Sequence, residues 1–105
     1  YLCQAGFFHQ RNRTAALHLY RIAQEAIRNA VKHSGAKQVA VSLNSRDAGW
    51  DLVIEDDGHG LPKDLAASGG MGLHIMKYRA KVIGAILKIA DREDGKGTRV
   101  SCFWR

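Results

Sequence analysis

Three polar side chains recur along one stretch, Leu19 to Ser34, at a spacing that could bind a charged ligand. On a helix, Glu25, Asn29 and Lys32 fall within about 60° of one another, and His33 lies at the edge of the same stripe. A carboxylate, a carboxamide and an ammonium group side by side can hold a hydrated cation, a polyanion, or both. The simpler interpretation is a solvated helix face with an i,i+4 hydrogen bond.

A second group of candidate residues, Asp56 to Gly60, directly follows a predicted strand. The strand would hold Asp56 rigidly, while Gly58 and Gly60 permit a tight turn and the close approach of a flat ligand. A buried carboxylate needs a partner, and the exocyclic amine of a purine is a suitable one. The competing interpretation is a type I or II turn in which Asp and Gly have their usual conformational roles.

A third motif, Gly69 to Leu73, opens a second helical period. Glycines at a helix start expose backbone N–H groups, and together with the helix dipole these groups form an anion site. The alternative is a flexible loop whose glycines precede a helix by chance. The three motifs occur in an order and at separations that would let one nucleotide contact all of them.

The first motif lies on a predicted amphipathic helix. This helix is expected to run from about Ala15 to His33, after a polar connection at residues 10–13 in which Asn12 or Thr14 could cap it. Gly35 suits a left-handed C-cap. The predicted apolar arc comprises Tyr20, Ala23, Ile27, Ala30 and Val31.

The other motifs are carried by predicted strands and a second helix. Strands are expected at residues 1–8, 38–44, 50–54, 85–90 and 98–104. The strands on either side of the turn at residues 46–49 should form an antiparallel hairpin, and the second helix should run from Leu73 to Ile83 and end at Gly84. This order predicts an α+β fold: a two-layer sandwich with a mixed, mostly antiparallel sheet and helices on one face.

Composition limits the class of protein. The 105 residues, 46% hydrophobic and 25% charged, suit one small globular domain without an apolar run that could span a membrane. The net charge of +6 fits a phosphorylated ligand or an acidic partner, but the basic residues are scattered and not interleaved with aromatics, which argues against nucleic-acid binding. Cys3 and Cys102 lack metal-ligand spacing; buried thiols are expected, with a bridge between terminal strands as the alternative.

Together the motifs resemble the ATP-binding catalytic domain of sensor histidine kinases, in the superfamily that includes DNA gyrase and heat-shock chaperone ATPases. The segments LYRIAQEAIRNAVKHSGA, IEDDGHGLP, GGMGLHIMKYRA and KGTRV are similar to the nitrate-sensor and lipid-fluidity-sensor type of kinase. The resemblance covers essentially the whole chain. It implies a Bergerat-type sandwich.

The resemblance assigns a role to each polar residue of the first helix. Glu25 would be the general base or water-positioning group, and Asn29 would be an oxygen ligand for Mg²⁺. Lys32 would reach phosphate oxygens, and His33 would lie beside the nucleotide.

The other motifs would complete the nucleotide site. Asp56 matches the aspartate that takes the adenine amino group, and Thr98 matches a threonine near the adenine in the closing strand. Arg79 matches a basic position for which structural pairing is expected. The backbone positions implied are Gly58 and Gly60 beside the base and Gly70, Met71, Gly72 and Leu73 around the phosphates.

The resemblance further implies ATP·Mg²⁺ binding and transfer of the γ-phosphate to a histidine on a separate dimerisation domain, for relay to a response regulator. None of the five histidines is followed by the acidic residue typical of a phosphoacceptor. Residues 1–105 are therefore expected to be a single catalytic domain, excised from a longer sensor kinase, that does not autophosphorylate alone. The domain should be soluble and cytoplasmic even where its parent is anchored in the inner membrane.

Alternative functions remain open. A related superfamily ATPase and an anti-sigma-type serine kinase compete, although the brief lid at residues 63–68 argues against the large ATPases. A degenerate nucleotide-binding or docking module is a third possibility. The presence of Glu25, Asn29 and Asp56 argues against it, because loss of one of them would be its expected mark.

Overall fold

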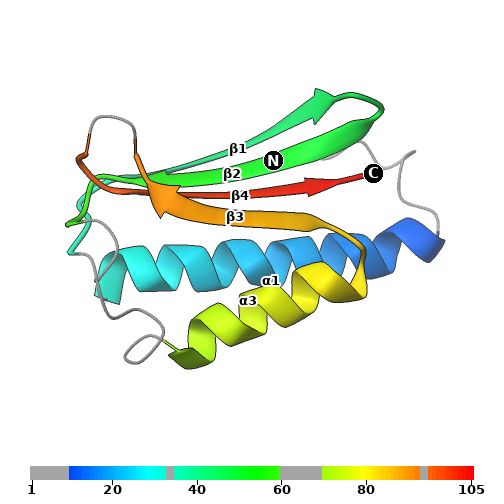
Figure 1. Cartoon of the computed structure of the whole chain (residues 1–105), viewed down its shortest axis with the longest axis horizontal. Helices are drawn as coiled ribbons and strands as arrows, with labels where there is room; N and C mark the ends of the chain where they lie inside the picture. Colours follow the sequence, from blue (N-terminus) through cyan, green and yellow to red (C-terminus); the bar gives the residue numbers. More distant parts are fainter. Residues whose placement is uncertain (1–9, 33–34, 60–69, 93–94) are drawn as a thin grey trace.

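The computed structural model describes residues 10–32, 35–59, 70–92 and 95–105. The elements in these ranges are α1 (Gln10–Lys32), β1 (Val39–Arg46), β2 (Gly49–Asp56), α3 (Gly70–Val82), β3 (Ile86–Asp91) and β4 (Thr98–Trp104). Figure 1 shows the two helices lying together on one side of the sheet. The strand predicted at residues 1–8 lies outside the described residues.

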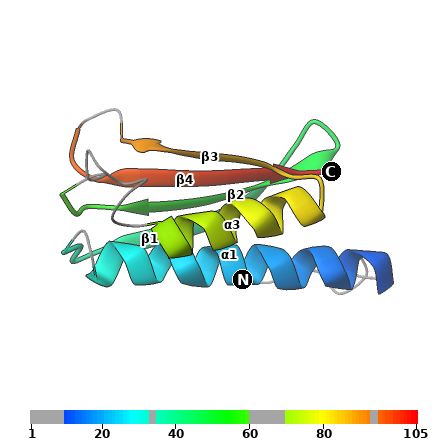
Figure 2. The ribbon, with the colours of Figure 1, turned by 60° about the horizontal axis from the view of Figure 1, so that its bottom comes forward.

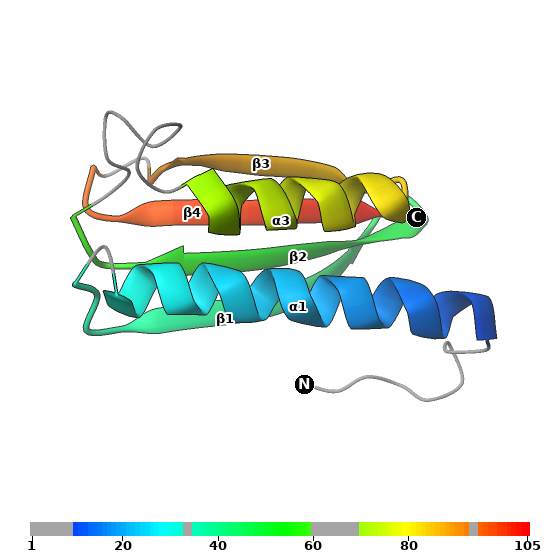
Figure 3. The same ribbon diagram turned by 90° about the horizontal axis from the view of Figure 1, so that it is seen from below.

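The described strands form one sheet in the order β1-β2-β4-β3, and each neighbouring pair is antiparallel. Seen from two further directions, α1 and α3 run side by side across the same face of this sheet (Figures 2 and 3). The predicted α+β architecture, with helices on one face, is confirmed. The two side chains predicted to contact the base lie on the two central strands, Asp56 on β2 and Thr98 on β4.

The hairpin between β1 and β2 is built as the sequence predicts. Asp47 and Ala48 form the turn with φ of 51° and 62°, and Arg46 pairs with Gly49. Two consecutive residues with positive φ give a turn whose twist matches that of the flanking strands. Gly49 is required for a different reason, because a Cβ there would lie 2.6 Å from the backbone oxygen of Trp104 on β4.

The predicted apolar arc of α1 is wrong in its direction. Tyr20 and Val31 are each 58% exposed, and Ile27 is 36% exposed. The buried stripe of α1 consists of Ala15, Ile22, Ala26 and Ala30. Of the predicted arc, Ala30 is buried, and Ala23 packs at the border of the core. The prediction was wrong because it assumed that the larger apolar side chains would be the buried ones. The alanines allow the helix to approach the sheet and α3 closely, which the larger side chains of the predicted arc would prevent.

The predicted start of α1 is also wrong. Residues 10–13 are helical, so neither Asn12 nor Thr14 precedes the helix as a cap. This segment contains no Gly or Pro, and its Gln and Arg residues are good helix formers, so nothing in it stops the helix.

A glycine with positive φ follows each of the helices α1 and α3, as predicted. Gly35 has a φ of +63°, and the Ala36 N–H donates to the carbonyl of Ala30 at 3.0 Å. At the end of α3, Gly84 has a φ of +71°, and the Ala85 N–H donates to the carbonyl of Ala80 at 2.8 Å. This second arrangement is a Schellman motif, which satisfies carbonyls that a helix end leaves unpaired.

The core lies between the central strands and the two helices. Its largest fully buried side chains are Ile22 on α1, Ile54 on β2 and Cys102 on β4. Burying a side chain such as Ile54 contributes about 1.5–3 kcal/mol to stability. None of the helices in the described ranges has the length and apolar character needed to cross a bilayer.

Cys102 provides a test of this core. Its free thiol is buried on the helix-covered face, and burial, followed by the charge of Asp51, raises its pKa to about 11. In a Cys3→Ala background we expect iodoacetamide at pH 8 to modify folded Cys102 at least about 100-fold more slowly than in urea-denatured protein, because the thiolate is the reactive form. Mass spectrometry of timed samples measures the two rates, and similar rates would contradict the described burial.

Candidate functional site

The candidate residues gather at one end of the molecule. The C-terminal end of α1, the end of β2, the start of α3 and the start of β4 lie together at the left of Figures 1 and 3. This follows from the register, because Asp56 at the end of β2 pairs with Val39, a few residues after α1 ends. Residues far apart in the sequence are therefore brought to a common edge of the sandwich.

The first and third motifs are in direct contact through Gly72. A Cβ placed on Gly72 would overlap the carboxylate of Glu25 and lie 3.5 Å from Oδ1 of Asn29. The backbone of the first turn of α3 is therefore held against the polar stripe of α1. A helix N-terminus carries partial positive charge, which favours the Glu25 carboxylate or any other anion at this point.

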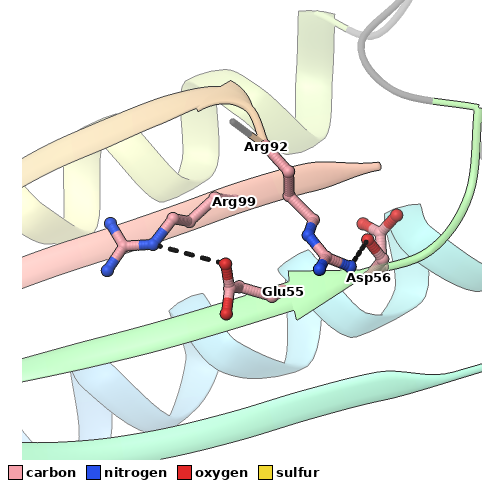
Figure 4. Close-up of polar contacts among 4 residues, drawn as sticks. All are labelled: Glu55, Asp56, Arg92 and Arg99. Atoms are coloured by element: carbon pink, nitrogen blue, oxygen red, sulfur yellow. Dashed lines mark hydrogen bonds and ion pairs between the residues drawn. The ribbon is translucent and has the colours of Figure 1, made fainter. Parts of the chain in front are cut away.

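Asp56 is buried, with 6% exposure, and is fixed from several directions. Its Oδ1 accepts the N–H of Gly58 at 2.8 Å. Its carbonyl oxygen accepts a hydrogen bond from Nη1 of Arg92 at 3.4 Å (Figure 4). Gly97, with φ of +132°, lies so close that any Cβ there would overlap the same carbonyl. The turn between β3 and β4 thus holds the peptide that carries the candidate base-binding carboxylate.

An exposed ion pair lies on the outer face of the same strands. Nε of Arg99 lies 3.5 Å from Oε2 of Glu55, with both side chains more than a third exposed (Figure 4). Such a pair contributes little to stability because water screens it. The pairing of Glu55 with Arg99 matters more for the site. It places Asp56 and Thr98 at the next positions of β2 and β4, on the opposite, helix-covered face.

Thr98 carries a buried hydroxyl on the same face of the sheet as the Asp56 carboxylate. The residue is 6% exposed, and its Oγ1 has no hydrogen-bond partner in the part of the chain that the structure describes. Leaving a buried hydroxyl unpaired is costly, so Thr98 Oγ1 calls for a polar partner, from a ligand or from an ordered water. A carboxylate next to a hydroxyl suits the edge of adenine, which presents an amino donor beside a ring-nitrogen acceptor.

Asp57 directly follows Asp56, and no role was predicted for it from the sequence. Its Oδ1 accepts the backbone N–H groups of Lys37 at 2.8 Å and Gln38 at 3.0 Å. These bonds, first the one from Gln38 and then the one from Lys37, hold the pKa of this exposed carboxyl below its usual value. The repeated Asp before Gly58 was a signal, but the partners lie in a connection that the sequence alone could not place beside it.

Not every predicted site residue is brought into the site by an observed contact. Lys32 is exposed at the end of α1, and His33 and Gly60 lie outside the described residues. Gly70 and Met71 begin α3, so their backbone N–H groups are at the expected helix end. The side chain of Leu73 is part of the hydrophobic core, which leaves only its backbone for a ligand.

Arg79 pairs as expected with the other helix. Its Nη1 lies 3.2 Å from Nδ1 of His18. Because a guanidinium can only donate, the imidazole nitrogen must be the acceptor.

Close to this pair, Glu25 lines an open groove of about 580 Å³ between α1 and α3, whose other lining residues are Arg21, Gln24, Ile27, Arg28, Ile75 and Arg79. Glu25 can therefore be reached from outside as well as from the start of α3.

Comparison with known proteins agrees with this geometry. Residues 14–105 match the family model described as histidine kinase-, DNA gyrase B-, and HSP90-like ATPase. The nitrate/nitrite sensor protein NarX of Escherichia coli is 39% identical over 85 residues, covering 81% of this chain and 14% of NarX. The sensor histidine kinase LiaS of Bacillus subtilis is 39% identical over 83 residues, covering 79% of this chain and 23% of LiaS. The chain thus spans less than a quarter of either relative.

Solved structures show the same fold. The ATP-binding domain of PrrB from Mycobacterium tuberculosis superposes with a TM-score of 0.68 at 30% identity, covering 81% of this chain and 64% of that one. The histidine kinase domain of the blue-light activated kinase EL346 from Erythrobacter litoralis gives 0.68 at 26% identity, covering 87% and 47%. With the family model matching most of its length, the chain belongs to the histidine kinase-, DNA gyrase B- and HSP90-like ATPase family, as an ATP-binding domain of the sensor histidine kinase kind.

Proposed function

We propose that this domain positions ATP·Mg²⁺ and donates the γ-phosphate to a histidine on a separate dimerisation domain of a sensor kinase, for relay to a response regulator. Family membership supports ATP binding, and the similarity to sensor kinases supports a kinase catalytic role. The observation that best supports the transfer is the close approach of Gly72 to Glu25 and Asn29, which places a helix start that would bind phosphate against a carboxylate and against the carboxamide that would bind Mg²⁺. We also propose that the domain works in the cytoplasm, where ATP is available.

The end of the central strands would bind the base. The Asp56 carboxylate would accept the adenine amino group, and the Thr98 hydroxyl would be paired by the same ring or by a bridging water. Gly58 and Gly60 would allow the flat base to approach the backbone closely. Because Asp56 and Thr98 are fixed by strands, the base would bind to a largely preformed surface.

The start of α3 would bind the phosphates. Backbone N–H groups of Gly70, Met71 and Gly72 lie at the positive end of this helix, which suits anions. Lys32, at the end of α1, and His33, which follows it in the sequence, would supply further contacts to the phosphates and the nucleotide.

Asn29 would be the protein's oxygen ligand for Mg²⁺. This ion is commonly held by few protein ligands together with substrate phosphates, so a single carboxamide beside a phosphate site fits it. When bound, the metal neutralises charge that develops on the phosphate oxygens.

Glu25 would act where the phosphoryl group is transferred. Because it lines the open groove between the helices, its carboxylate can meet a histidine presented from outside. As the bond from phosphorus to the imidazole nitrogen forms and the bond to the ADP oxygen breaks, the other ring nitrogen would release a proton, which Glu25 could accept. The rest of catalysis would be positioning and charge neutralisation.

Asp56→Asn tests the base site. The amide presents a neutral acceptor in place of a charged one, so we expect MgATP to bind about 10–100-fold more weakly. Calorimetric titration of the chain and the variant measures this, with Asp47→Asn in the distant β1–β2 turn as the matched control. If the folded chain fails to bind at millimolar nucleotide, the proposal fails, and a docking module without catalysis becomes the better description.

Glu25→Gln separates transfer from binding. In the full-length sensor kinase that contains this domain, we expect MgADP affinity to change by less than about threefold, while phosphorylation of the histidine slows by about 10²–10⁴-fold, the range typical of a lost general base. Quench-flow with γ-labelled ATP measures the transfer step. An unchanged rate would remove Glu25 from the mechanism.

Gly72→Ala tests the helix contact itself. The added Cβ would displace the Glu25 carboxylate, which is the end of a flexible side chain and can move, so we expect a loss of no more than about 1 kcal/mol in the free energy of unfolding. In a Glu25→Ala background the obstacle is removed, and because alanine favours a helix the same substitution should leave the stability unchanged or raise it by up to about 1 kcal/mol. Urea denaturation of the four proteins gives the coupling. Additive effects would show that the two residues do not touch in solution.

A further inference from the structure

One carboxylate connects two loops that are separate in the sequence. Asp57 follows β2, and its Oδ1 accepts the N–H groups of Lys37 and Gln38, which precede β1. The Asp57 N–H donates in return to the carbonyl of Gln38 at 3.3 Å. Three hydrogen bonds therefore join the segment after β2 to the connection between α1 and β1.

A second contact lies beside these bonds. Gly35, in the same connection, adopts a φ of +63°, and a Cβ there would lie 3.2 Å from Nε2 of His59. The connection at residues 35–38 and the turn at residues 56–59 thus meet at two points. They form a single unit that we name the inter-loop joint.

Each half of the inter-loop joint leads to a different part of the site. The connection follows directly from α1, which carries Glu25 and Asn29 on the phosphate side. The turn contains Asp56 and Gly58 on the base side. The joint therefore adds to the packing of α1 on the sheet in fixing the distance between the two sides.

We propose that Asp57 is a positioning residue of the nucleotide site, which holds the inter-loop joint so that the base-binding strand end and the phosphate-facing helix α1 keep the separation that one nucleotide requires. This inference rests on the proposed function, because it assumes that a single nucleotide contacts both sides. Asp57 acts through Asp56 and α1 and need not touch the ligand.

The chemistry of the joint explains why an aspartate suits this position. An ionised carboxylate makes stronger hydrogen bonds to N–H groups than a neutral oxygen does. The two bonds lower the pKa of Asp57, and the nearby Lys37 side chain adds a favourable charge. The joint is thus fully formed above the usual titration range of an aspartate and is lost only as pH falls through the lowered pKa.

The test measures MgADP affinity, because ADP binds without being turned over. Using calorimetry on the full chain at neutral pH, we expect Asp57→Ala to weaken binding about tenfold or more, since both accepted bonds are lost. Asp57→Asn keeps an acceptor oxygen but loses the charge, and should weaken binding about threefold. Asp47→Asn removes the same charge at the opposite end of the hairpin and should bind like the unmodified chain.

Amide chemical shifts provide a second readout that does not depend on the nucleotide. The N–H signals of Lys37 and Gln38 should titrate with the Asp57 carboxylate, at a pH below the usual aspartate range. In Asp57→Asn these two signals should not titrate. Urea midpoints of all variants show whether each remains folded.

The outcomes are distinguishable. If the unmodified chain binds MgADP and folded Asp57→Ala binds within twofold of it, Asp57 only stabilises a turn and the inference is overturned. If Asp57→Ala does not fold, Asp57→Asn decides in the same way, with unchanged affinity overturning the role of the charge. If the unmodified chain binds no nucleotide, the proposed function fails, and this inference fails with it.

Discussion

The close approach of two helices at one glycine shapes the end of the domain where the candidate site lies. Because Gly72 has no side chain, the first turn of α3 lies against Glu25 and Asn29, and the polar stripe of α1 faces a neighbouring helix start. A side chain at this position would displace the Glu25 carboxylate from the positive end of α3. The sheet makes this approach possible, since it carries both helices on the same face and holds them side by side (Figure 3).

The two ends of a nucleotide would meet different kinds of structure. The base would contact the ends of β2 and β4, where Asp56 and Thr98 are fixed by backbone pairing and by the turn that contains Gly97. The phosphates would contact helix ends, whose position depends on side-chain packing. Strand pairing spans the sheet and opens only with much of the fold, whereas a helix terminus can fray by itself. Recognition of the base should therefore be the more rigid part of the site, and the phosphate end the more adjustable.

The sequence predicted those features that depend on local pattern. Alternating apolar residues around Asp47 and Ala48 predicted the hairpin, and Gly35 and Gly84 predicted the helix ends. Features that depend on tertiary contact were missed. The buried face of α1 was misjudged because small alanines pack where bulky residues were expected, and Asp57 received no role because its partners lie 19 and 20 residues away. The roles of Asn29 and Lys32 came from family resemblance, which geometry supports for Asn29 through its approach to Gly72.

The open groove beside Glu25 has a consequence for side reactions. A carboxylate that a histidine can reach from outside is also accessible to water, and water could take the phosphoryl group in place of the histidine. The domain that presents the histidine would then do more than supply the acceptor: by covering the groove it would exclude the competing nucleophile. Docking would thus suppress futile hydrolysis of ATP. The fraction of ATP whose phosphoryl group reaches the histidine would depend on how completely the partner covers this groove.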